Sequence, residues 1–154
     1  MKTRSEYILL FMPIAIKRVY EKPADSDGPR VLVDRLWPRG LKKADARIDH
    51  WLKDLAPSEI LRKWFHSSAN WVVFKKRYFK ELCTPEASEA LSMLYQLMNE
   101  HGRATLVYAS RDTEHNNAVA LKEVLEGMRK PPSSTGPARA AATSGRIAKR
   151  RPGR

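Results

Sequence analysis

The 154-residue chain contains a single cysteine, Cys83, so no disulfide can form within it. This suits the reducing cytosol, and we expect a cytoplasmic location. Cys83 falls inside a helical pattern of apolar residues, which favours a small buried side chain over a nucleophile. The chain also lacks any cysteine and histidine cluster with zinc spacing, and we assign it no metal site.

Long hydrophobic runs are also missing. The apolar stretch over residues 7–16 is much shorter than the ~20 residues that a membrane-spanning helix needs. Lys2 and Arg4 precede it as in a signal peptide, but Glu6 interrupts it and no small-residue cleavage site follows. We therefore expect no membrane association, an N-terminal extension over residues 1–12, and a first strand over 14–20.

Acidic residues are absent from the C-terminal end. Residues 128–154 carry eight Lys and Arg, while residues 1–127 carry the remaining 21 basic residues and all 17 acidic ones, a net +4 against +12 for the chain. The other residues of this segment are mainly Pro, Ser, Ala and Gly. Such a composition buries too little apolar surface to offset about 1–2 kcal/mol of backbone entropy per residue. We expect one domain over 13–127 and a disordered basic tail over 128–154.

Basic tails contact nucleic-acid phosphates, so the tail is a candidate for nucleic-acid binding. Its basic side chains available for this role include Arg139, Arg146, Lys149, Arg150 and Arg151.

Two apolar, β-branched runs, over residues 31–33 and 104–109, are typical of buried strands. Each stops abruptly at a paired Asp and Arg. The polar residues that follow the two runs are Asp34, Arg35, Ser110, Arg111 and Asp112. In an open parallel sheet, ligands bind beyond the carboxyl ends of the strands. If the two strands are neighbours, these side chains share one rim.

Helical spacing of apolar residues fills the rest of the chain. Helices are predicted to begin near Asp45, Ser58, Trp71 and Thr84, and a last one to run from about 114 to Glu126, closed by Gly127. The first of these places Ile48, Trp51, Leu52 and Leu55 on one face, and the second turns Ile60, Leu61, Trp64 and Phe65 inward. The order predicts a small α/β domain with a mainly parallel sheet covered by helices. Three strands are few, and another can lie in a loop.

The segment over residues 33–40 is the densest functional candidate. Arg35 and Arg39 flank Trp37, and an Arg side chain offers a planar fork of donors that matches phosphate or carboxylate. Trp37 offers a flat face on which a base or sugar can stack. In the alternative interpretation, Asp34 pairs with Arg39 or Arg111, and Trp37 fills the core.

The second candidate lies over residues 110–117, between a strand and a helix start, where free backbone N–H groups favour an anion. Asp112 or Thr113 can instead simply cap the helix. His115 and Asn116 are expected on its first turn, where His115 could act as acid, base or ligand donor, or be incidental. His66, at the end of another helix, either caps carbonyl groups or points into the crevice.

The string Asp-Arg-Leu-Trp-Pro-Arg-Gly at 34–40 resembles the YeaO-like family, bacterial proteins with a domain of unknown function (number 488). The segments over 16–20, 56–66 and 106–116 agree with it, and the resemblance covers about residues 14–125. It implies a small intracellular α/β protein. It carries no reaction or cofactor that can be transferred residue by residue.

Three functions stay open. In an enzyme or ligand pocket, Asp34 or Asp112 would serve as general base beside His115. The ligand would be anionic or nucleotide-like and would be held by Arg35, Trp37, Arg39, Ser110, Arg111 and Asn116. A metal held by Asp34, Asp112 and His115 gains no support from their spacing. The second function is a nucleic-acid-binding or accessory protein that uses the tail. The third is an interaction domain whose Asp and Arg groups are mutually paired, with no pocket between them.

Overall fold

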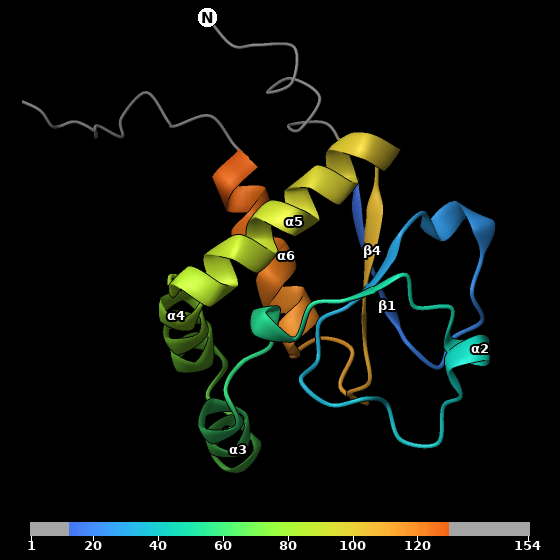
Figure 1. Cartoon of the computed structure of the whole chain (residues 1–154). Helices are drawn as coiled ribbons and strands as arrows, with labels where there is room; N and C mark the ends of the chain where they lie inside the picture. Colours follow the sequence, from blue (N-terminus) through green and yellow to red (C-terminus); the bar gives the residue numbers. More distant parts are fainter. Residues whose placement is uncertain (1–12, 130–154) are drawn as a thin grey trace, which may run out of the picture.

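The computed structural model describes residues 13–129; the predicted extension over 1–12 and nearly all of the predicted tail, with its five named basic residues, lie outside this range. The elements are β1 (Ile14–Arg18), η1 (Asp25–Asp27), β2 (Arg30–Leu32), α2 (Lys43–Ala46), β3 (His50–Trp51), η2 (Lys53–Leu55), α3 (Glu59–Ser68), α4 (Trp71–Glu81), α5 (Pro85–His101), β4 (Ala104–Tyr108) and α6 (Asn117–Arg129) (Figure 1). None of the helices in this range is long and apolar enough to cross a membrane.

The four strands form one parallel sheet in the order β1-β4-β2-β3. The predicted small α/β domain with a parallel sheet is therefore confirmed. The central strand β4 is buried along its whole length, as its apolar run predicts. It lies between β1 and β2, with Arg18 opposite Tyr108 and Leu32 opposite Val107. The carboxyl ends of these three strands consequently meet at one edge of the sheet.

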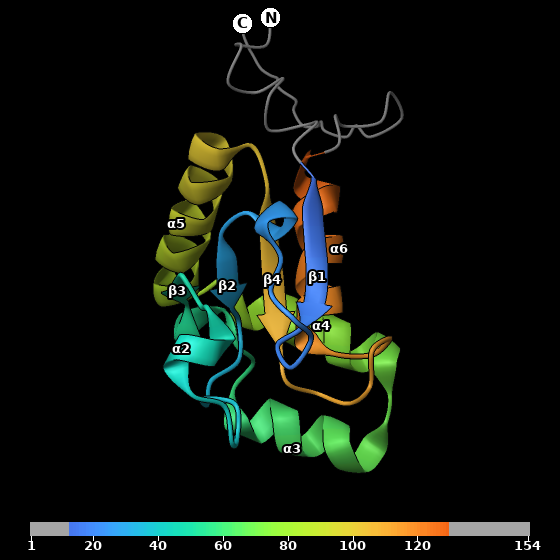
Figure 2. The same ribbon diagram turned by 90° about the vertical axis from the view of Figure 1, so that its right-hand side faces the viewer.

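Each face of the sheet has its own cover. Val31, Val33 and Leu106 pack into the main core, on the face that carries α5 and α6 (Figures 1 and 2). Leu32 and Val107 belong to a smaller cluster on the other face, because successive side chains of a strand alternate between faces. Helices thus cover one face, and the loops around α2 cover the other.

Side-chain caps set the helix starts that the sequence predicts. The side chains of Ser58, Asn70 and Thr84 each accept a hydrogen bond from the backbone N–H three residues later, at the starts of α3, α4 and α5. The expectation that Ile60 turns inward is wrong, since it is 84% exposed. Helix α3 lies across the carboxyl ends of the strands rather than on a sheet face (Figure 2), and Leu61 is its one buried residue.

The predicted helix starting at Asp45 is wrong. Helix α2 ends at Ala46, Arg47 adopts a left-handed conformation with φ 50°, and the chain continues into β3. The backbone N–H groups of Asp49 and Leu52 donate to the carbonyls of Arg30 and Leu32, at 2.9 and 3.0 Å. Strand β3 therefore pairs the outer edge of β2, whose polar backbone groups a helix would leave unsatisfied. Strand β3 is therefore the additional strand that the sequence suggested could lie in a loop.

Two smaller expectations also fail. Cys83 is exposed in the turn after α4 and not buried within a helix. Helix α6 begins at Asn117, three residues later than predicted, and continues past Gly127 to Arg129. A glycine inside a helix costs about 1 kcal/mol relative to alanine, so it weakens a helix without ending it.

Candidate functional site: a pocket at the strand ends

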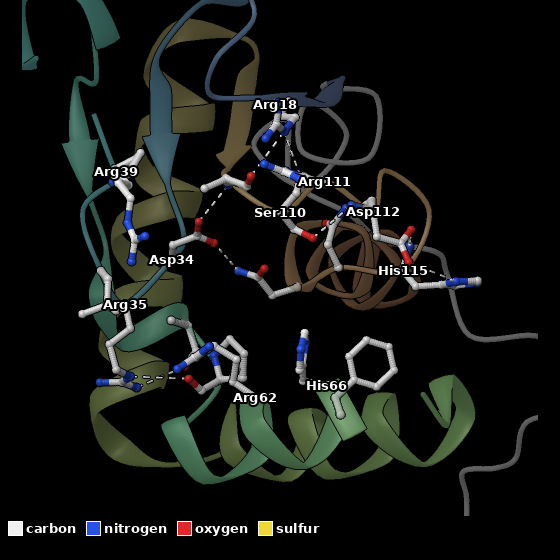
Figure 3. A pocket seen from close by; sticks show the side chains of 18 of the residues that line it. Arg18, Asp34, Arg35, Arg39, Arg62, His66, Ser110, Arg111, Asp112 and His115 are labelled. Atoms are coloured by element: carbon white, nitrogen blue, oxygen red, sulfur yellow. Dashed lines mark hydrogen bonds and ion pairs between the residues drawn. The ribbon is translucent and has the colours of Figure 1, made fainter. Parts of the chain in front are cut away.

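An open pocket of about 1260 Å³ lies at the carboxyl ends of β1, β2 and β4, with α3 on its opposite side (Figure 3). The structure brings the two predicted segments together there. All nine residues singled out in the sequence line the pocket: Asp34, Arg35, Trp37, Arg39, Ser110, Arg111, Asp112, His115 and Asn116. Arg39 and Arg111, which are 72 positions apart in the chain, thus share one hollow.

Asp34 ties three elements together just beyond the end of β2. Its Oδ2 accepts a hydrogen bond from the backbone N–H of Ala109 at 2.8 Å, and its Oδ1 accepts one from the Asn117 amide at 3.0 Å. Burial raises the pKa of the Asp34 carboxyl, although these two hydrogen bonds act in the opposite direction. The predicted alternative, an ion pair with Arg39 or Arg111, is wrong, because no ion pair to Asp34 occurs within residues 13–129.

Five guanidinium groups line the pocket against two carboxylates, a formal charge of +3 with the histidines neutral. The five are Arg18, Arg35, Arg39, Arg62 and Arg111, and the two acids are Asp34 and Asp112. Arg35 donates to the carbonyls of Ala56 and Pro57 at 3.3 and 3.4 Å. Over the part of the chain that the structure describes, neither Arg39 nor Arg111 has a side-chain hydrogen bond or an ion pair.

Arg18 and Arg62 also line the pocket, although neither was among the predicted site residues. Arg18 ends β1, and its Nε donates to the carbonyls of Ala109 and Ser110 at 3.2 and 2.9 Å. The rule that identified Arg35 and Arg111, an arginine at the end of an apolar strand, would also have found Arg18. Arg62 gives no such signal, because only the tertiary structure places α3 over the strand ends (Figure 3).

The loop after β2 is held by contacts other than the Arg39 side chain. Trp37 donates from Nε1 to the Leu41 carbonyl at 2.6 Å and packs edge-on against Trp51, with ring centroids 5.4 Å apart. The Tyr20 hydroxyl donates to the backbone carbonyl of Arg39 at 2.7 Å. The loop is fixed at its backbone, and the exposed Arg39 guanidinium stays available to a ligand.

The loop after β4 is organised around Asp112. The Asp112 Oδ1 accepts from the backbone N–H groups of Glu114 and His115, both at 2.9 Å. These two hydrogen bonds lower the pKa of the Asp112 carboxyl, and the bond from His115 has the larger effect. The Ser110 hydroxyl oxygen in turn accepts from the Asp112 N–H at 3.2 Å. The carboxylate of Asp112 is thus engaged in shaping its own loop.

The expected cap of α6 is corrected by the structure. Asn116, and neither Asp112 nor Thr113, caps the helix: its Oδ1 accepts from the Val119 N–H at 2.9 Å. The Asn116 Nδ2 donates to the Asp112 carbonyl at 2.8 Å, so both ends of this amide are used inside the protein. His115 accordingly precedes the helix instead of lying on its first turn, and its ring packs 5.0 Å from that of Trp71.

The side opposite the strand ends is partly aromatic. It includes Phe65 and His66 from α3 and Phe74 from α4, and the rings of Phe65 and Phe74 lie 4.5 Å apart. His66 points from α3 toward the strand ends (Figure 3), the second of its two predicted roles. Within residues 13–129, no group of three or more His, Cys, Asp or Glu side chains could hold a metal ion. The pocket therefore combines cationic donors with flat apolar surface.

Comparison with known proteins decides the family. Residues 13–141 match the model of a family described as "Inactive DUF488-N3 subclade". The chain belongs to this YeaO-like DUF488 family. The protein YeaO of Escherichia coli (strain K12) is 39% identical over 118 residues, which cover 76% of this chain and 100% of YeaO. The protein Rv3073c of Mycobacterium tuberculosis (strain ATCC 25618 / H37Rv) is 41% identical over 117 residues, 74% of this chain and 94% of Rv3073c.

Both DUF488 relatives are described as uncharacterized proteins, so their descriptions name no ligand or reaction. No solved structure matches. The resemblance that the string at 34–40 suggested is confirmed by this membership, and residues 34–39 line the pocket.

Proposed function

We propose that this DUF488 protein binds a small anionic ligand, of a phosphate-bearing and nucleotide-like kind, in the pocket at the strand ends. One observation carries the proposal: Arg39 and Arg111 line a single pocket, and neither has a carboxylate partner among the described residues. Guanidinium groups match phosphate oxygens with two parallel hydrogen bonds.

The interaction-domain alternative predicts that the Asp and Arg groups neutralise one another and leave no hollow. The described residues show the reverse arrangement, because Asp34 is bound by amides and the pocket stays open. Three excess positive charges in a cleft attract an anion and raise its local concentration. The aromatic side, with Phe65 and His66, suits the planar part of a nucleotide-like molecule.

Binding is favoured over catalysis, although Asp34, Asp112 and His115 were candidates for acid-base roles. The matching family model describes its subclade as inactive. Asp112 uses its carboxylate to hold backbone N–H groups, which lowers its pKa and makes it a weak base. A general base needs a pKa close to the working pH.

Calorimetric titration of the full chain with pyrophosphate and with a nucleoside 5′-monophosphate tests this proposal. Arg39→Ala and Arg111→Ala should each weaken binding about tenfold, since each removes a charge-assisted pair worth roughly 1.5 kcal/mol or more. Lys76→Ala is the matched control. Lys76 is exposed on α4 outside the pocket, and its substitution also removes one positive charge. Failure of both probes to bind, or an equal loss in the control, would contradict the proposal.

A second candidate function is nucleic-acid binding through the C-terminal segment. Its support is the charge pattern of the sequence, eight basic residues and no acidic one over 128–154. Contacts of this kind go to phosphates and weaken steeply with salt.

A further inference from the structure

The side chain of Asn117 has an orientation that its hydrogen bonds determine. Its Nδ2 donates both to the Val33 carbonyl at 2.8 Å and to Asp34 Oδ1 at 3.0 Å. Both partners are acceptors, so the amide nitrogen must face them and the flipped amide is excluded. The Asn117 Oδ1 therefore points away from this pair, and it accepts no hydrogen bond from the residues that the structure describes.

Asp34 has acceptor capacity left as well. Each of its carboxylate oxygens receives one hydrogen bond, from Ala109 or from Asn117. A carboxylate offers about four lone-pair sites, so two remain. Asp34 and Asn117 both line the pocket. Their free groups are all hydrogen-bond acceptors, because Asn117 Nδ2 already donates to Val33 and Asp34. We call these two residues the acceptor pair.

The acceptor pair sits among the arginines. In Figure 3 the Asp34 carboxyl lies between Arg39 on one side and Ser110 and Arg111 on the other. A bare anion would occupy the guanidinium groups and leave the acceptor pair facing its negative charge. A ligand that carries hydroxyl groups next to its anionic group satisfies both, because hydroxyls donate to carboxylate and amide oxygens while phosphate accepts from arginine.

We infer that the ligand is a phosphorylated polyol, with the sugar of a ribose phosphate as the fitting class, and that Asp34 and Asn117 accept hydrogen bonds from its hydroxyls. This rests on the proposed function for the anionic end of the ligand. Carboxylates bind ribose hydroxyls in dinucleotide-binding folds by the same chemistry. Asp34 and Asn117 thus determine which anion binds, and the arginines supply the attraction.

The test compares ribose 5-phosphate with pentyl phosphate, which has the same anionic group and chain length but no hydroxyls. We expect ribose 5-phosphate to bind the wild-type full chain at least tenfold more tightly in calorimetric titration. Asp34→Asn and Asn117→Ala should each reduce this preference to about twofold. Arg111→Ala should weaken both ligands together.

The two proposals fail in different ways. Equal or tighter binding of pentyl phosphate by the wild type, still sensitive to Arg111→Ala, would overturn the hydroxyl inference and leave the anion site standing. Absence of binding by either phosphate would overturn both. The comparison of the two ligands needs no variant, so it remains decisive even if Asn117→Ala fails to fold.

Discussion

Asp34 lies among arginines but forms no ion pair with them in the described part of the chain. Its carboxylate is instead bound by amide groups. Burial raises its pKa above the ordinary value of 3.8, so the folded protein holds the proton more tightly than the unfolded chain does. Its contribution to stability is therefore present below about pH 3.8 and is lost as the pH rises through the raised value. Asp34→Asn removes this titration.

We predict that the wild type loses thermal stability relative to Asp34→Asn between about pH 4 and pH 7. Asp112→Asn provides a comparison of opposite sign. The pKa of Asp112 is lowered, chiefly by the N–H of His115, so its contribution is present above pH 3.8 and is lost as the pH falls. Melting temperatures of the three proteins from about pH 2 to pH 7 check the prediction, because the Asp112 transition lies below pH 3.8 and the Asp34 transition above it. Parallel curves for wild type and Asp34→Asn would contradict it.

At the scale of elements, the start of α3 is clamped to the end of α4 by Glu81. One carboxylate oxygen of Glu81 accepts from the Ser58 N–H at 2.7 Å, and the other accepts from the Ser58 hydroxyl at 2.6 Å. The same hydroxyl oxygen accepts from the Leu61 N–H at 3.1 Å. Because Leu61 is the one buried residue of α3, this clamp helps to decide where the helix lies over the pocket.

Glu81→Ala should destabilise the protein by about 1–3 kcal/mol, since it leaves the Ser58 donors without their partner. It should also weaken ribose 5-phosphate binding several-fold, although Glu81 does not line the pocket, because Arg62 and His66 move with α3. Urea denaturation and calorimetry measure the two effects. Glu89→Ala, an exposed change on α5, serves as control. A stability loss with unchanged affinity would show that other contacts position α3.

Elements were predictable where the signal is local. Ser58, Asn70 and Thr84 lie next to the helices that they cap, so the starts of α3, α4 and α5 could be predicted from neighbouring residues. The pair His50–Trp51 forms a strand only because the outer edge of β2 needs a partner. The spacing of Ile48, Trp51 and Leu52 fits a helix equally well, and nothing in the segment itself resolves that ambiguity.

At the scale of the whole molecule, the pocket is assembled from segments far apart in the chain. Both apolar clusters of the described residues lie within 13–129, so this unit has a core of its own. The described residues that line the pocket all lie between Arg18 and Asn117.

Truncation after Lys130 should therefore leave the melting temperature and the affinity for ribose 5-phosphate unchanged. If the basic segment binds nucleic acid, the full chain should bind labelled DNA with strong salt dependence and the truncated chain should not. Fluorescence anisotropy at two salt concentrations measures this, with the Lys76→Ala full chain as a control for loss of a basic side chain elsewhere. DNA affinity that survives truncation would instead assign the binding to the α/β unit.

The residue types of the candidate site could be identified from local patterns in the chain. Apolar runs that end in Asp and Arg identify strand ends through short-range signals, and parallel strands bring such ends to one edge. Three features depend on long-range packing: α3 crosses this edge, Arg62 joins the pocket, and amides rather than arginines bind Asp34. These contacts join residues as distant as Asp34 and Asn117, and their geometry depends on how the whole chain packs.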